Sequence, residues 1–412
     1  MKQNLTPVRG TNDYLPKEML VREYVRSTIL KTYKKYGFMQ ISAPILEDIN
    51  NLMGSDGGDN EKLIFKVLKR GEKLDLTKQN LEEKDIVDIG LRYDLTVPMV
   101  RLFSNNQNSL PSPFKSIQID YSFRADRPQR GRSRQFIQCD IDILGDATNN
   151  AEIDILNTTG KTFCALGFKN FVIKINDRRI LSDLIKMSDF DKADEKDICI
   201  CLDKIDKVGL NGVQEELLNR GYQKKNVDKL IAYLNDVTSS GINALKKLGV
   251  NEDAVLSVEK IINTVNSLAG NKYKAVFDIS IVRGQGYYTG AVYEVYVPGF
   301  GGACGGGGRY DNMVEKMTGK SVPAVGFGLG FEPTCMLVLE QNLISAKEEL
   351  IACIYNKEDN FADVLSYTEK LSEKANVSAI CAKKNLAFQL DNLKANGFTK
   401  FVKFGTNKIE NL

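Results

Sequence analysis

Two alternating stretches enclose an arginine-rich turn, and they constrain the fold more than any other feature of the sequence. Residues 114–123 read FKSIQIDYSF and residues 137–145 read IQCDIDILG, with apolar and polar side chains alternating in each. A period of two is typical of half-buried strands, because successive side chains of a strand point to opposite faces. We therefore predict a hairpin of two strands that rises from a larger sheet.

The turn of this hairpin carries five arginines and no lysine within residues 123–136, namely Arg124, Arg127, Arg130, Arg132 and Arg134. A guanidinium group grips phosphate or carboxylate through two parallel hydrogen bonds, a geometry that an ammonium group does not supply. Most basic residues elsewhere in the chain are lysines, so the turn is predicted to clamp phosphate. The alternative is a solvated basic loop, which is what a run of like charges more often forms.

Composition excludes several classes of protein. A chain of 412 residues, 42% of them hydrophobic, can form two or three domains with sizeable cores. Its 56 basic and 53 acidic residues leave a net charge of only +3, so any anion site must be local. We expect a cytoplasmic protein, because no apolar signal core or membrane-length segment is present. The eight scattered cysteines form no CxxC pair, which favours buried thiols over a zinc site or disulfide framework.

The sequence contains no histidine. This absence excludes Ser-His-Asp triads, Cys-His pairs, histidine general bases and histidine metal ligands. Any chemistry must therefore use arginines, carboxylates, tyrosines, backbone dipoles or an oxygen-bound cation such as Mg²⁺.

The order of patterns along the chain predicts four regions. Residues 1–177 begin with a helix over 17–36, ended by Gly37, and continue with strands, the first of them broken at Pro44. Residues 178–272 are predicted to be an inserted helical domain, with no clear strand pattern after the apolar run at 197–202. Strands resume in residues 273–345. Residues 346–412 alternate strand, helix, strand, helix and strand, which predicts a small α/β domain.

A glycine run lies between the strand patterns of the third region. It reads GFGGACGGGGRYD over residues 299–311. Such a run is either a flexible loop or a segment whose backbone approaches a ligand closely, because glycine has no side chain to prevent contact.

Several stretches together resemble one family, the histidyl-tRNA synthetases of class II. APILE at 43–47 resembles motif 1 of the class, and residues 123–145, with their RPQ-x-GR core, resemble motif 2. IVRGQGYYTGAVYE at 281–294 and GGRYD at 307–311 are similar to the two histidine-specific signatures. VPAVGFGLGFE at 322–332 is similar to motif 3.

The resemblance implies an α+β fold, with an antiparallel sheet flanked by helices, the inserted helical domain and a C-terminal α/β anticodon-binding domain. It also implies a homodimer with motif 1, including Pro44, at the interface. The implied activity uses ATP with Mg²⁺ to convert histidine to histidyl-adenylate, and then transfers histidine to the 3′ end of tRNA. The attacking carboxylate of histidine is already an anion, so this reaction suits a chain without a histidine base.

Carried over by position, the resemblance implies an ATP site in the hairpin. Arg124 would hold the α-phosphate and Arg132 the distal phosphates. Phe136 would stack on adenine, and Asp126 would also belong to the ATP site. Arg283 would be the catalytic arginine, bridging the substrate carboxylate and the α-phosphate.

The resemblance places a histidine site beside the ATP site. Asp94, Thr96 and Gln138 would bind the α-amino group, and Arg283 the carboxylate. Asp142 and Tyr288 would reach the imidazole, with Tyr287 shaping the pocket. Without the resemblance, Asp94 and Asp142 read as strand-end or surface carboxylates, and the two tyrosines as packing residues of a strand. No metal ligand is expected among these side chains.

The sequence departs from the family pattern at two places. Pro333 replaces the arginine that follows Glu332 in motif 3, so a cation for the γ-phosphate is missing and ATP use should be weakened. Residues 285–286 read QG where Leu-Asp is common. Pro333 favours a second hypothesis, a paralogue like the regulatory subunit of ATP phosphoribosyltransferase. The C-terminal α/β pattern and the arginine clamp favour the ligase. An RNA-binding module without catalysis is a third hypothesis, which the near-neutral charge supports little.

Overall fold

The computed structural model describes residues 4–54, 61–129, 131–283, 287–344, 349–373, 375–406 and 408–412. Arg130 and residues 284–286, which belong to two of the motifs, lie outside the described residues. The chain divides into two compact units. The larger contains residues 1–12 and 25–341, and the smaller contains residues 13–24 and 342–412.

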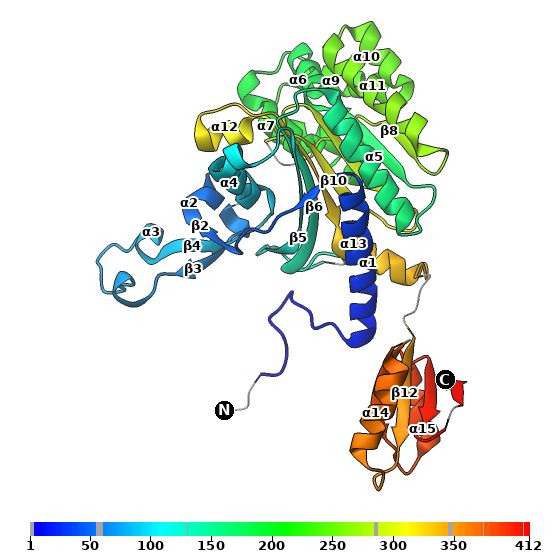
Figure 1. Cartoon of the computed structure of the whole chain (residues 1–412). Helices are drawn as coiled ribbons and strands as arrows, with labels where there is room; N and C mark the ends of the chain where they lie inside the picture. Colours follow the sequence, from blue (N-terminus) through cyan, green and yellow to red (C-terminus); the bar gives the residue numbers. More distant parts are fainter. Residues whose placement is uncertain are drawn as a thin grey trace. The chain divides into compact units, whose positions relative to one another are not determined.

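A sheet of eight strands runs through the larger unit (Figure 1). In spatial order its strands are β1 (Met39–Gln40), β5 (Phe114–Phe123), β6 (Gln135–Leu144), β11 (Ala324–Gly330), β10 (Ala303–Arg309), β9 (Ala291–Tyr296), β7 (Val172–Asp177) and β8 (Lys274–Phe277). Neighbours from β5 to β7 are antiparallel, and the outermost pairs β1–β5 and β7–β8 are parallel. The expected α+β class, with a largely antiparallel sheet, is confirmed.

The predicted hairpin is the pair β5–β6, in continuous register from Phe114 opposite Leu144 to Phe123 opposite Gln135. On one face of β6 the side chains of Cys139, Ile141 and Ile143 are buried in the core. The alternate residues point to the opposite face. This alternation separates an apolar face from a polar face along a single strand.

Helices of the larger unit cover the sheet and its edges (Figure 1). The predicted first helix is confirmed as α1 (Pro16–Lys35), and its residues from Val25 onward belong to this unit. The others outside the insertion are α2 (Ile49–Met53), α3 (Glu83–Ile86), α4 (Thr96–Asn106), α5 (Asn149–Ala165), α12 (Asn312–Thr318) and α13 (Phe331–Glu340). Single 3-10 turns occur at Glu61–Leu63, Gly71–Lys73, Gln107–Ser109 and Lys192–Asp194.

Residues 178–272 are helical, as expected, and follow β7 directly. Their helices are α6 (Arg178–Met187), α7 (Glu195–Leu202), α8 (Ile205–Asn219), α9 (Lys224–Ser240), α10 (Ile242–Leu248) and α11 (Glu252–Ala269). The apolar run at 197–202 belongs to helix α7 rather than to a strand. Its buried side chains, Ile198, Cys199, Cys201 and Leu202, follow the spacing of a helix face.

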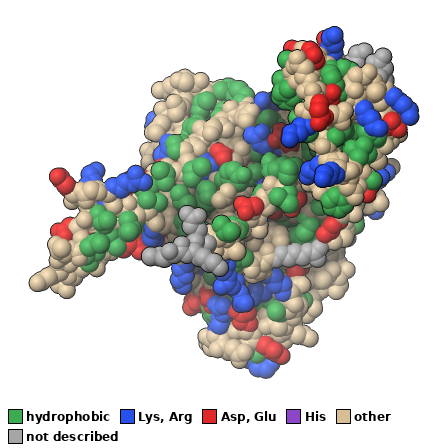
Figure 2. All heavy atoms as spheres, turned by 90° about the horizontal axis from the view of Figure 1, so that it is seen from below, with side chains coloured by type: hydrophobic (Ala, Val, Ile, Leu, Met, Phe, Trp, Pro, Cys, Tyr) green, Lys and Arg blue, Asp and Glu red, His purple; other side chains and the backbone are tan. Residues whose placement is uncertain are grey.

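A separate three-stranded sheet carries motif 1. It is formed by β2 (Leu46–Asp48), β4 (Val87–Leu91) and β3 (Phe65–Leu68), in the order β2-β4-β3. Pro44 separates β1 from β2, which confirms the predicted break. Figure 2 shows apolar side chains on the surface of the segment that carries this sheet. The exposed large apolar residues of this stretch include Leu46, Leu68, Leu76 and Leu81.

The smaller unit has a four-stranded sheet in the order β13-β12-β14-β15. Its elements are β12 (Leu350–Tyr355), α14 (Phe361–Ser372), β13 (Asn376–Cys381), α15 (Leu386–Ala395), β14 (Lys400–Lys403) and β15 (Ile409–Asn411). Strands β13, β12 and β14 are parallel, as the alternating pattern predicts, and β15 adds an antiparallel edge that the pattern did not indicate.

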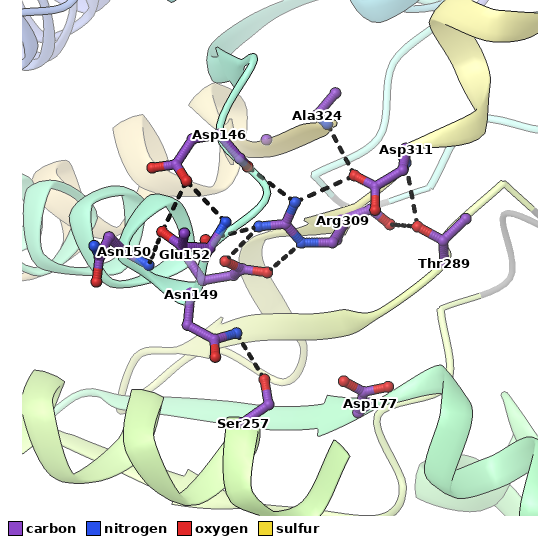
Figure 3. Close-up of polar contacts among 12 residues, drawn as sticks. Asp146, Asn149, Asn150, Glu152, Asp177, Ser257, Thr289, Arg309, Asp311 and Ala324 are labelled. Carbon is purple, nitrogen blue, oxygen red and sulfur yellow. Dashed lines mark hydrogen bonds and ion pairs between the residues drawn. The ribbon is translucent and has the colours of Figure 1, made fainter. Parts of the chain in front are cut away.

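A buried ion pair joins the GGRYD segment to helix α5 (Figure 3). Arg309 donates from Nε and Nη2 to the two carboxylate oxygens of Glu152, at 2.6 and 2.7 Å. It also donates to the backbone carbonyls of Asp146 and Thr148 and to the carboxylate of Asp311. Glu152 is 1% exposed and Arg309 is 8% exposed. Each charge is therefore paired and bonded, which buried charges require.

Replacing Glu152 by glutamine should leave the buried charge of Arg309 paired only through the longer and more exposed contact to Asp311. We expect Glu152→Gln to lower the free energy of unfolding by about 3 kcal/mol. Glu259→Gln removes the exposed pair between Lys246 and Glu259 and should cost less than about 1 kcal/mol. Urea unfolding of both variants measures the difference, and equal costs would contradict it.

Candidate active site

One cavity of about 550 Å³ opens over the polar face of β6. It is bounded by the hairpin turn, the segment 287–288, strands β10 and β11, and the start of α13. All the site residues predicted from the sequence line it, namely Asp94, Thr96, Arg124, Asp126, Arg132, Phe136, Gln138, Asp142, Arg283, Tyr287 and Tyr288. They come from three stretches of the chain, 94–96, 124–142 and 283–288, so the fold brings them together around one space.

The hairpin turn forms the basic end of the cavity. Arg124, Arg127 and Arg132 line the cavity, which argues against a merely solvated basic loop. The Arg124 guanidinium donates from Nε to the carbonyl of Tyr93 at 3.0 Å and lies 5.1 Å from the ring centre of Phe136. Arg132 is fixed by two backbone hydrogen bonds with Gln129, at 2.9 and 3.1 Å.

Arg134 has a different place from the other described arginines of the turn. It donates to the backbone carbonyls of Asp126 and Arg9, and so ties the hairpin turn to the N-terminal segment. The all-arginine turn thus contains both cavity-lining residues and a residue that holds the loop. The sequence pattern alone does not separate these two roles.

Three buried carboxylates form the opposite end of the cavity. Asp94, Asp140 and Asp142 are only 3%, 5% and 3% exposed. Asp142 accepts a hydrogen bond of 2.5 Å from the Tyr310 hydroxyl, and Asp94 caps helix α4 by accepting from the backbone N–H of Val97. Asp94 and Asp142 are therefore buried groups of the cavity, not surface carboxylates.

The carboxylates perturb one another. Burial raises the pKa of Asp142 to about 7, with a further increase from the charge of Asp94, while the Tyr310 hydrogen bond lowers it. Burial and the charges of Asp142 and Asp94 also raise the pKa of Asp140 well above its usual range. A cation bound between them would relieve both effects.

Asp140 is a cavity residue that sequence reasoning missed. It lies between Gln138 and Asp142 on the same face of β6, and among the described residues its Oδ1 atom has no hydrogen-bond partner. The signal was available, because Gln138, Asp140 and Asp142 alternate with apolar residues in QCDID. The strand period places all three on one face. Tyr310, Glu294 and Asp203 also line the cavity and were not predicted.

Arg283 is held in an unusual conformation at the cavity wall. Its φ of +59° lies in the left-handed region, which few residues other than glycine adopt. Its Nη1 atom donates to Oε1 of Glu294 at 2.8 Å. A Cβ atom at Gly306 would lie 2.3 Å from this Nη1, so only glycine leaves room for the guanidinium.

Tyr287 and Tyr288 were predicted either to line a binding site or to pack in the core, and they do both. Both line the cavity, yet Tyr288 is also part of the buried apolar core with Val292 and Tyr310, and Tyr287 packs against it. Their ring centres are 4.7 Å apart, and the Arg283 guanidinium lies 5.9 Å from the Tyr288 ring centre.

Residues 303–309 of the glycine run form strand β10 rather than a flexible loop, whereas residues 299–302 lie in the turn before it. Together with β11, strand β10 forms the floor of the cavity. Gly305 to Gly308 pair with Gly326 to Leu329 of β11. A Cβ at Gly307 would lie 2.0 Å from the carbonyl oxygen of Gly326, and one at Gly326 would lie 2.1 Å from Oδ1 of Asp142. A side chain at Gly326 would fill the space where Asp142 lies, and one at Gly307 would collide with the backbone of β11.

Pro333 lies at the basic end of the cavity, as the third residue of α13. Proline is tolerated in a first helical turn because the N–H groups there have no partner within the helix. A Cβ at Gly131 of the hairpin turn would lie 3.8 Å from its ring. The neighbouring Glu332 accepts a hydrogen bond from the backbone N–H of Ile137.

Two further observations concern the part of the chain that the structure describes. Within it, no three carboxylates or thiols converge where they could hold a metal ion by themselves. None of its helices combines the length and apolar character needed to cross a membrane.

Comparisons with known proteins point to one family. A family model described as histidyl-tRNA synthetase matches residues 10–333. A histidine–tRNA ligase of Leifsonia xyli is 36% identical, covering 97% of this chain and 95% of its own length. Another, of Cytophaga hutchinsonii, is 34% identical, covering 88% and 84%.

Two solved structures share the fold. Histidyl-tRNA synthetase from Nostoc has a TM-score of 0.77 at 24% identity, covering 97% of this chain and 91% of its own. A protein from Bacillus halodurans, described as an ATP phosphoribosyltransferase regulatory subunit/histidyl-tRNA synthetase, has a TM-score of 0.75 at 17% identity, covering 98% and 99%. The family model and the curated relatives decide the assignment: the chain belongs to the histidyl-tRNA synthetase family.

Proposed function

We propose that the protein is a histidine–tRNA ligase, an enzyme that activates histidine with ATP and transfers it to the 3′ end of tRNA. The observation that carries this proposal is that one cavity is lined both by the arginines of the hairpin turn and by three buried carboxylates. Such a cavity suits two substrates bound end to end, one an anion and the other bearing cationic groups.

The basic end is proposed to bind ATP. Arg124 holds the α-phosphate, Arg132 the distal phosphates, and Phe136 stacks on adenine, with Asp126 beside them. The nucleophile is the carboxylate of histidine, which needs no proton removed. Positioning and charge stabilisation then account for the catalysis.

The acidic end is proposed to bind histidine. Asp94, Thr96 and Gln138 receive the α-ammonium group, and Asp142 and Tyr288 the imidazole, with Tyr287 as a wall. We add Asp140, which lies between Gln138 and Asp142 on the same face of β6 and lines the same cavity. Arg283, which lines the same cavity, is proposed to bridge the histidine carboxylate and the α-phosphate.

Mg²⁺ is proposed to enter with ATP. This ion usually keeps several waters and is bound through one or two carboxylates together with substrate phosphates. Glu332 and Asp126 line the basic end and can supply such a carboxylate. The ion would supply charge neutralisation of the phosphates.

The remaining partners follow from the same proposal. The smaller α/β unit would bind the tRNA anticodon, and the protein would work in the cytoplasm. A homodimer is proposed through the motif 1 region, where Met39, Ile45 and Leu46 expose apolar side chains. Arg92 supports that segment by donating to the carbonyls of Ala43 and Pro44.

One observation favours a second function. Pro333 supplies no cation at the basic end of the cavity. A regulatory protein that senses histidine without using ATP would not need that cation. The named relatives and the arginines that line the cavity support the ligase more strongly.

Pyrophosphate exchange tests the ligase directly. The purified protein should convert labelled pyrophosphate to ATP only when histidine is added. Arg124→Lys keeps the charge but loses the planar fork, so exchange should fall at least about a hundredfold while the fold persists. Near-normal exchange by this variant would contradict the role of the clamp.

Restoring a cation at position 333 tests the cost of proline there. We expect Pro333→Arg to lower the KM for ATP or raise kcat by about tenfold, the value of one charge-assisted hydrogen bond. Pro333→Ala removes the ring without adding charge and serves as the control. If both wild type and Pro333→Arg lack exchange activity, the regulatory hypothesis gains support.

Asp142 should reduce the stability of the empty protein. Its pKa of about 7 lies above the unfolded value near 3.8, so the folded state holds the proton more tightly. The free energy of unfolding therefore falls as the pH rises from about 4 to about 7. Asp142→Asn should raise Tm most at pH 8, less at pH 5, and little below pH 4.

Histidine should raise the Tm of the wild type and not that of Asp142→Asn. The exposed Asp236 provides the control, since Asp236→Asn should leave both the pH dependence and the histidine response unchanged. A variant at position 142 that kept the wild-type pH profile would show that this carboxyl does not titrate as described.

A further inference from the structure

The hydrogen bonds that fix the Arg283 side chain extend beyond the cavity. Glu294 uses its Oε1 atom to accept from Arg283 and its Oε2 atom to accept from the Tyr296 hydroxyl, at 2.8 Å in both cases. Glu294 and Tyr296 are two residues apart on β9, so their side chains lie on the same face of the strand. Tyr296 thus acts on Arg283 through Glu294.

The same hydroxyl contacts the helical insertion. The Tyr296 oxygen lies 3.0 Å from Oδ2 of Asp206, a residue in the first turn of α8. A phenol has one hydrogen and can donate it to only one acceptor at a time. Glu294 and Asp206 therefore compete for a single proton donor. The ammonium of Lys174, 4.5 Å from the ring centre, is paired with Asp278.

A second contact joins the insertion to the cavity. Asp203, which follows α7, lines the cavity on the Arg283 side. Burial and the charge of Glu294 raise the pKa of Asp203, whereas the charge of Arg283 lowers it. Gly209 interrupts α8 with φ +68° and ψ 175°, so residues 203–208 form a corner rather than part of a continuous rod.

We propose that Asp206 and Tyr296 are positioning residues through which the helical insertion sets the orientation of Arg283. The chain of contacts runs Asp206, Tyr296, Glu294, Arg283. Movement of the 203–208 corner changes the share of the Tyr296 proton that Glu294 receives, and with it the grip on the arginine. The effect of this coupling on catalysis rests on the proposed function, whereas its effect on the orientation of Arg283 does not.

Stability alone does not account for this arrangement. Asp206 is exposed, and a hydrogen bond at the solvent edge contributes little to folding. The same contact can matter for rate, because small displacements of a group at a reaction centre have large effects. A positioning role therefore predicts altered turnover in a protein of unchanged stability.

Kinetics of pyrophosphate exchange form the first test. Asp206→Ala should lower kcat about fivefold with little change in the KM values for ATP and histidine. Asp206→Asn keeps an acceptor oxygen and should restore most of the rate. In a Tyr296→Phe background, Asp206→Ala should have no further effect, because the path is already cut. Asp236→Ala, a change at an exposed position of the same insertion, is the matched control.

Labelling of arginine by phenylglyoxal forms the second test and does not depend on activity. Mass spectrometry should show Arg283 modified more slowly in Asp206→Ala, where Glu294 receives the whole Tyr296 hydrogen bond, and faster in Tyr296→Phe, where Glu294 receives none, with Arg124 unchanged as the internal reference. Independent, additive effects on kcat, or equal labelling of Arg283 in all variants, would overturn the coupling. If wild type shows no exchange, the proposed function fails and the labelling still decides the coupling.

Discussion

The register between β5 and β6 fixes where the charges of the cavity lie. Phe114 pairs with Leu144 and Phe123 with Gln135, without interruption. A slip of one residue would turn Gln138, Asp140 and Asp142 into the core and bring Cys139 and its apolar neighbours to the cavity. The arginine turn and the acidic face belong to the same hairpin, so one register sets both ends of the site.

The cavity gains its chemistry at a cost in stability. Three carboxylates lie buried close enough to raise the pKa of Asp140 and Asp142, and the charge of Arg124 offsets only part of this effect at Asp140. The Arg309–Glu152 pair behaves differently, since each partner is fully bonded. The Arg309–Glu152 pair has its hydrogen-bond partners within the protein, whereas the cluster of three carboxylates is suited to a cationic ligand.

Sequence periodicity predicted the elements in which apolar side chains repeat at a regular spacing. The hairpin, the first helix and the C-terminal alternation were predicted because their apolar residues repeat at two or at 3.6 residues. The strand state of Gly305–Gly308 could not be predicted, because glycine has no side chain and the state depends on its partners in β9 and β11. Glu294 and Asp203 were missed for a related reason, since their importance lies in long-range contact with Arg283.

The floor of the cavity consists of peptide backbone, and this limits which amino-acid substitutions the site can accept. At Gly306, Gly307 and Gly326 any added side chain would collide with Arg283, with a backbone carbonyl or with Asp142. Point substitutions therefore cannot adjust the depth of the cavity by small steps. A lineage that acquired a different substrate would have to alter the walls first, at positions such as Asp140 or Tyr287. Saturation mutagenesis should show that the glycines of the floor accept few substitutions, whereas positions at the edge of the cavity accept more.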